Sequence, residues 1–116
     1  MDPHSLEYRT SLTKMLTSLF DHWGLEVQDR AALLGLPTFE QSGPLENNKD
    51  ALARAGILLG VHKCLRTIFP QNIDLAYLWV TRPNKQFENN TPLSCMLKSR
   101  HGSELIRHYL EQECER

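Results

Sequence analysis

The residues that could do chemistry in this chain of 116 residues are five histidines, three cysteines and a few acidic side chains. His62 and Cys64 are the histidine and cysteine closest in sequence. On a helix, positions i and i+2 diverge, so this pair cannot hold a metal ion without other ligands. His101 and His108 are expected on two different helices, because Gly102 separates them. The spacing predicts no metal site, and we expect no cofactor.

Nucleophilic catalysis would need a serine or cysteine beside a histidine and an orienting acid. Cys95 is the obvious candidate, but it lies between Leu93 and Met96 on an apolar-leaning segment, where a buried structural cysteine is the commoner role. A glycine-rich phosphate-binding loop is not present either, because Gly56 and Gly60 fall within a predicted helix. We therefore expect the protein not to be an enzyme.

Helices must position these residues, since no segment alternates between apolar and polar residues over the length of a strand. The sequence predicts an all-α fold. Its helices are expected over residues 5–23, 26–34, 49–69, 73–81, 92–99 and 104 onward.

Capping residues and apolar spacing set these limits. Gly24 and Gly35 are predicted to end the first two helices, and Asn48, Asn72, Thr91 and Ser103 to cap later ones. Between residues 36 and 48, breakers leave room for one short helical turn at most. The inward positions are expected to include Met15 and Trp23, Val27, and Leu105, Ile106, Tyr109 and Leu110. The helix over residues 73–81 carries the apolar residues Leu75, Ala76, Leu78 and Trp79.

Charge is distributed unevenly along the chain, although the formal net charge is only −1. Residues 1–48 carry three bases against seven acids (−4), residues 49–102 eight against three (+5), and residues 103–116 two against four (−2). Such patches are typical of surfaces that meet charged partners and also of ordinary solvation. Three scattered cysteines, the absence of an apolar run of roughly 20 residues and a start unlike a signal peptide predict a cytoplasmic protein.

Two stretches carry a resemblance to a known family. Leu25-Glu26-Val27-Gln28-Asp29-Arg30-Ala31-Ala32-Leu33-Leu34-Gly35-Leu36 resembles the first helix and turn of an Xre-type helix-turn-helix. The ordered set Phe69-Pro70, Trp79, Pro83-Asn84, Phe87 and Pro92-Leu93 looks like the toxin-binding domain of Xre/MbcA/ParS-type antitoxins. The resemblance covers roughly residues 10–112 and divides the chain into an N-terminal module (1–48) and a toxin-binding domain (49–116).

The resemblance implies a partner and a surface. Antitoxins of this family pair with RES-domain toxins, which are similar to ADP-ribosyl-transferring enzymes and deplete NAD⁺, and the antitoxin covers the entrance to the toxin's active site. The implied toxin-binding residues are Pro83, Asn84, Phe87, Pro92, Leu93, Met96, Leu105, Tyr109, Leu110 and Arg116. Trp79 and Phe87 are expected to act mainly as core anchors that hold the loop in a binding conformation. A homodimer or a larger hetero-oligomer with the toxin is also expected.

The segment expected to recognise DNA departs from the family pattern. The place of a recognition helix is taken by residues 37–44, which contain no Lys or Arg and are broken by Gly43 and Pro44. We interpret the N-terminal module as a degenerate helix-turn-helix. Two alternatives stay open: a DNA-binding repressor of its own operon, since the basic middle could bind nucleic acid non-specifically, and an immunity protein against a delivered effector toxin.

In the leading hypothesis, the last helix and tail lie across the NAD⁺ entrance of the toxin. Truncation from Gly102 onward is then expected to abolish protection and to leave residues 1–100 largely helical.

Overall fold

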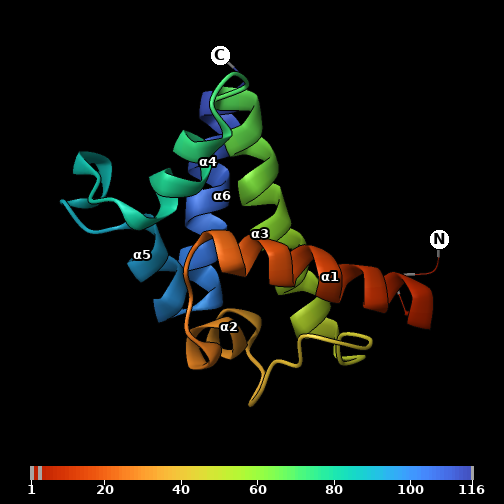
Figure 1. The fold of residues 1–116 in the computed structure, drawn as a ribbon. Coiled ribbons are helices and arrows are strands. Elements are labelled where there is room, and N and C mark those ends of the chain that lie inside the picture. Colours follow the sequence, from red (N-terminus) through yellow and green to blue (C-terminus); the bar gives the residue numbers. More distant parts are fainter. Residues whose placement is uncertain (1, 3, 116) are drawn as a thin grey trace. The chain divides into compact units, whose positions relative to one another are not determined.

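The structure is a computed structural model that describes residue 2 and residues 4–115 (Figure 1). Over the described residues it contains six α-helices, a short 3-10 helix and no strand, which confirms the predicted all-α class. The helices are α1 (Leu6–His22), α2 (Val27–Leu34), α3 (Lys49–Ile68), α4 (Ile73–Thr81), α5 (Pro92–Lys98) and α6 (Arg100–Cys114), and the 3-10 helix is η1 (Lys85–Phe87). No described helix combines the length and the apolar composition that crossing a membrane requires.

The chain forms two compact units, Met1–Gly56 and Ile57–Arg116. The division falls within α3, which supplies its first turns to unit 1 and the remainder to unit 2. The functional boundary between residues 48 and 49 stays a prediction, because compactness alone does not show where a functional module begins.

The helix ends follow local capping chemistry. The predicted N-caps Asn48, Asn72 and Thr91 are confirmed: their side-chain oxygens accept hydrogen bonds from backbone N–H groups three residues later, at 3.1, 3.3 and 3.0 Å. Gly24 and Gly35 follow the first two helices with φ of +67°, the left-handed conformation that glycine adopts without a steric penalty.

The start of α6 differs from the prediction. Gly102 does not break a helix and Ser103 does not cap one; the cap is Ser99, whose hydroxyl accepts a hydrogen bond from the Gly102 backbone at 3.1 Å. Gly102 lies buried in the first turn of α6, where a β-carbon would overlap the carbonyl oxygen of Cys95. Glycine is therefore needed for close helix packing at this position, and not to end a helix.

Unit 1 is built on the apolar face of α1. The long irregular segment 36–48, which contains no helical turn, is fixed to α1 by hydrogen bonds of 2.9 and 3.0 Å between Arg9 and the Leu45 backbone. Phe39 meets Phe20 edge to face at 5.5 Å between ring centroids. The buried apolar side chains of this unit are Leu12, Leu16, Leu19, Phe20, Trp23, Leu25, Ala31, Leu33, Leu34, Leu36, Phe39, Leu45, Ala51 and Ala55.

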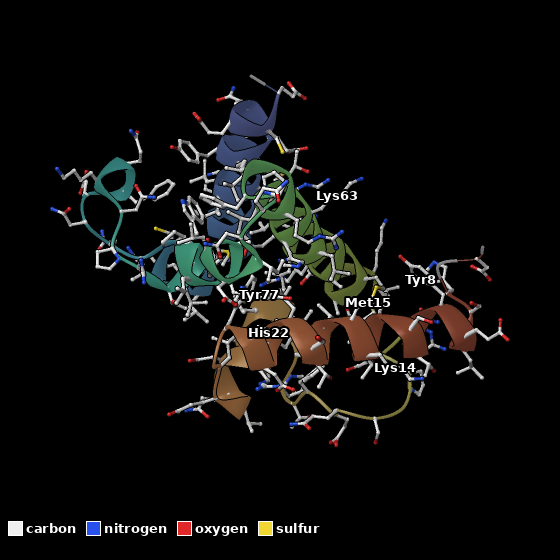
Figure 2. All side chains as sticks on the ribbon, turned by 45° about the horizontal axis from the view of Figure 1, so that its top comes forward. Tyr8, Lys14, Met15, His22, Lys63 and Tyr77 are labelled. Carbon is white, nitrogen blue, oxygen red and sulfur yellow. The ribbon has the colours of Figure 1, made fainter. Side chains whose placement is uncertain are left out.

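Two predicted inward positions in unit 1 are wrong. Met15 is 47% exposed and Val27 is 61% exposed. Figure 2 shows Met15 on α1 together with Tyr8 and Lys14. In place of Val27, α2 buries Arg30, whose guanidinium pairs with Asp21 at 2.9 Å.

Unit 2 has its core between the C-terminal part of α3 and helices α4, α5 and α6. Helix α5 packs against both α4 and α6. At Gly60 on α3, the side chain of Arg107 from α6 occupies the space that a β-carbon would need. The buried apolar side chains are Ile57, Leu58, Val61, Leu65, Ala76, Val80, Met96, Ile106 and Leu110.

Candidate interaction surface

The loop between α4 and α5 is held by Asn84. Its side-chain oxygen accepts a hydrogen bond from the Gln86 backbone at 2.9 Å, and its backbone N–H donates to the Asn90 carbonyl at 3.1 Å. Its own carbonyl accepts from Phe87 and Asn89, each at 3.0 Å. A single asparagine thus organises a closed turn, and Pro83 beside it remains exposed.

An aromatic cluster joins this loop to α4 and α6. Phe87 meets Trp79 edge to face at 6.1 Å and Tyr109 at 5.3 Å, and the rings of Trp79 and Tyr109 lie nearly parallel at 6.3 Å. All three side chains are half-buried. The cluster anchors the loop on the helices, as expected for Trp79 and Phe87, and Tyr109 completes it.

The residues implied by the resemblance divide by burial. Pro83 and Leu105 are exposed, whereas Asn84, Phe87, Leu93 and Tyr109 are half-buried and Pro92, Met96 and Leu110 are buried. Arg116 lies outside the described residues. The buried side chains belong to the unit's own core, so any effect they have on a partner acts through the positions of α5 and α6.

Helix α6 has one large apolar residue facing outward. Leu105 is 54% exposed, which contradicts its predicted inward position, while Ile106 and Leu110 are each 1% exposed. Tyr109, one turn after Leu105, lies on the same stripe of the helix. Leu105 and the exposed edge of the aromatic cluster therefore form one apolar strip along α6.

Sequence reasoning did not foresee the outward face of α4. Leu75 and Leu78 are 38% and 39% exposed. They line an open groove of about 200 Å³ together with Phe69, Trp79, Arg82, Pro83 and Asn84. A signal was present in the sequence, because Asp74 is the sole charged residue of a helix that is apolar nearly all round.

The side chains singled out for chemistry take structural positions. The ring of His62 stacks on Tyr77 at 5.0 Å. Cys114 donates a hydrogen bond to the Cys64 carbonyl at 3.4 Å. Burial, with contributions from Cys114 and Glu111, raises the pKa of the Cys64 thiol to about 11. Within residue 2 and residues 4–115, no group of three His, Cys, Asp or Glu side chains is arranged to hold a metal ion.

The geometry thus offers surfaces for binding, carried by α4, the α4–α5 loop and α6. A comparison with family models identifies this same region. Residues 64–113 match the model of the antitoxin Xre/MbcA/ParS C-terminal toxin-binding domain. Among curated proteins and solved structures, no match to the chain is found.

The antitoxin match confirms the resemblance from the end of α3 through almost all of α6. The matched model is that of a toxin-binding domain, which implies a cognate toxin as partner and an antitoxin role. The match does not extend to residues 25–36, so the helix-turn-helix resemblance stays a prediction.

Proposed function

We propose that this protein is an antitoxin that binds a RES-domain, NAD⁺-depleting toxin in the cytoplasm and covers the entrance to its active site. The observation that carries the proposal is the match of residues 64–113 to an antitoxin toxin-binding domain. The RES partner and the mechanism of occlusion rest on the family resemblance. No chemical step is required of this chain.

Helix α6 is the proposed toxin-facing element. Leu105 offers apolar area to a partner, and the aromatic cluster beside it fixes the loop that contains Pro83 and Asn84. The last residues of α6 and the tail after it would lie across the NAD⁺ entrance, where they exclude substrate by occupying space.

The test is the substitution Leu105→Asp in the full-length chain. Because the side chain is exposed, the change should leave the fold intact and weaken toxin binding at least about ten-fold, since a charge would lose its water on docking. Val27→Asp is the matched control: Val27 is 61% exposed, but it lies in unit 1. Binding is measured by calorimetry with the RES protein encoded next to this chain, and inhibition by NAD⁺ consumption.

Three results bear on the proposal. Loss of inhibition with Leu105→Asp and full inhibition with Val27→Asp would support it. Equal affinity of Leu105→Asp and the unsubstituted chain would remove α6 from the interface. Neutralisation of a toxin of different chemistry, with no effect on the RES protein, would overturn the partner assignment.

The structure also changes how occlusion should be tested by truncation. Deletion from Gly102 onward would remove Ile106 and Leu110, which are core residues, so the expectation that the remainder stays intact no longer holds. Ending the chain after Leu110 keeps both. We expect this shorter chain to bind the toxin and to lose inhibition; full inhibition by it would contradict occlusion by the end of α6 and the tail.

A further inference from the structure

Two cysteines lie next to each other in unit 2, where α3 and α6 meet near their C-terminal ends (Figure 1). The thiol of Cys114 on α6 donates a hydrogen bond to the backbone carbonyl of Cys64 on α3 at 3.4 Å, although the two residues are 50 positions apart in sequence. The two thiols also interact with each other, and this interaction contributes to the raised pKa of Cys64. Both are free cysteines, so the fold brings two nucleophilic sulfur atoms together without a bond between them.

The packing of α3 on α6 holds these two positions close. Gly60 lies one turn before Cys64, and a β-carbon at Gly60 would lie 2.9 Å from the side chain of Arg107 on α6. Gly60 and Cys64 are four residues apart, and Arg107 and Cys114 seven, so each pair shares one face of its helix. The two faces are turned toward each other, and the two cysteines are therefore brought together by the helices that carry them.

The cysteine pair can be reached from solvent. Both side chains are half-buried and line an open hollow of about 350 Å³ between α3 and α6. The charged residues that line the hollow are Lys63 on α3 and Arg107, Glu111 and Glu115 on α6. Arg107 pairs with Glu111 at 3.7 Å, whereas Lys63 is exposed beside Cys64 on α3 (Figure 2). The hollow thus has room for part of a small peptide-like reagent, and Lys63 supplies a positive charge near the sulfur atoms for an anionic one.

We propose that Cys64 and Cys114 form a redox site, which a low-molecular-weight disulfide such as oxidised glutathione converts into an intramolecular disulfide. The thiolate of Cys114 attacks one sulfur of the oxidant, which forms a mixed disulfide and releases one glutathione. The sulfur of Cys64 then attacks Sγ of Cys114 and releases the second glutathione. The protein loses two electrons and two thiol protons, and the oxidant takes up both as two glutathione thiols.

The order of the two attacks follows from the burial of Cys64. The attacking form is the thiolate, and burial raises the pKa of Cys64 to about 11, so this thiol is almost fully protonated at neutral pH. Of the facing charges, Glu111 adds to this shift and Arg107 opposes it. Cys114 therefore attacks first, and closure by Cys64 is the slow step. The thiolate fraction of Cys64 rises about ten-fold for each pH unit below its pKa, and the rate of closure should rise with it.

The disulfide would join the last turn of α6 to α3. A bond between residues 50 positions apart restricts the unfolded chain much more than the folded one. The midpoint of thermal unfolding of the oxidised chain should therefore lie about 10 °C above that of the reduced chain. In a reducing thiol pool the pair stays open, so the end of α6 is fixed only when the pool becomes oxidising.

The experiment treats the purified full chain with oxidised glutathione, blocks the remaining thiols with an alkylating reagent and locates the disulfide by mass spectrometry. Trypsin places the three cysteines on three different peptides, and we expect residues 64–66 joined to residues 108–116. Cys64→Ser should stop at a mixed disulfide on Cys114. In the unsubstituted chain, closure of the mixed disulfide should be about ten-fold faster at pH 8 than at pH 7.

Cys95→Ser is the matched control, since Cys95 is the third half-buried cysteine and lies on α5. It should form the disulfide at the same rate as the unsubstituted chain, and circular dichroism should show the same helix content for all variants. A chain that keeps its thiols, stops at mixed disulfides or forms bonds between chains would overturn the proposal. So would a disulfide that includes Cys95, and equal rates of closure at the two pH values would overturn the assigned order of attack.

The outcome is separable from that of the proposed function. Leu105→Asp should lose the toxin and still form the disulfide, because Leu105 lies on the exposed face of α6. Cys114→Ser should lose the disulfide and still bind the toxin. Failure of the disulfide would therefore leave the antitoxin role untouched, and failure of toxin binding would leave the redox site untouched.

Discussion

At the scale of single residues, Gly102 decides whether α5 and α6 can pack. Gly102→Ala should lower the free energy of unfolding by about 3 kcal/mol, because the added methyl group meets the rigid carbonyl of Cys95 and not a movable side chain. Gly56→Ala is the control on α3, since a β-carbon there has no neighbour within 4 Å. It should stabilise the protein by about 0.5–1 kcal/mol through helix propensity. Urea denaturation followed by circular dichroism measures both, and equal effects would contradict the packing argument.

The thiol of Cys64 should make the free energy of unfolding fall as the pH rises above about 9. The folded protein keeps the thiol protonated up to a pKa of about 11, against an ordinary value of 9.0, because burial disfavours the thiolate. A proton held more tightly in the folded state stabilises it fully below about pH 9, and this contribution is lost as the pH rises toward 11. Cys64→Ser, which does not titrate there, should lose less stability between about pH 8 and about pH 10.5. The midpoint of thermal unfolding measures this, and parallel pH profiles for the two chains would refute it.

At the scale of elements, the cap at Ser99 sets where α6 begins. Its hydroxyl accepts the hydrogen bond from the Gly102 backbone N–H. Without this acceptor the N–H group would be unpaired in the folded protein, which would lower its stability. Ser99→Ala should lower the free energy of unfolding by about 1 kcal/mol. Ser11→Ala, at an exposed interior position of α1, should leave the free energy of unfolding unchanged. If both substitutions had the same effect in denaturant titrations, the cap would not be stabilising.

The end of a helix could be predicted from the sequence where it depends on residues a few positions away in the chain. Asn72 and Thr91 were recognised as caps because the hydrogen bond they accept comes from a residue three positions away. Gly102 was misread because its role depends on the carbonyl of Cys95 in another helix, which no local pattern reveals.

The candidate surface was predictable only in part. Trp79 and Phe87 were expected to anchor the loop, since large aromatic side chains near breakers usually pack inward. Helix α4 is apolar almost all round, so periodicity could not show that Leu75 and Leu78 face outward. Leu105 and Ile106 are both predicted to face inward on α6, but only Ile106 is buried, and Leu105 is 54% exposed.

At the scale of the whole molecule, α3 is a continuous helix that contributes core residues to both units. Ala51 and Ala55 are buried in unit 1, and Val61 and Leu65 in unit 2. Because one helix cannot unfold at its centre without loosening both cores, the two units should unfold in one cooperative transition.

Two tryptophans can report on the units separately. Trp23 belongs to unit 1 and Trp79 to unit 2, so Trp23→Phe and Trp79→Phe each leave a single fluorescent probe. Within each variant, the fluorescence and circular dichroism transitions in urea should share one midpoint. Separate midpoints in either variant would show that the units unfold independently.

The junction between α5 and α6 consists of Ser99 alone, with an extended backbone. Because the connection is one residue long and Gly102 packs against α5, α6 has little freedom to change its direction relative to α5. The proposed toxin-facing helix is therefore preorganised, and docking should cost little conformational entropy. Differences in affinity among surface variants of α6 should then appear in the dissociation rate, while the association rate stays nearly constant.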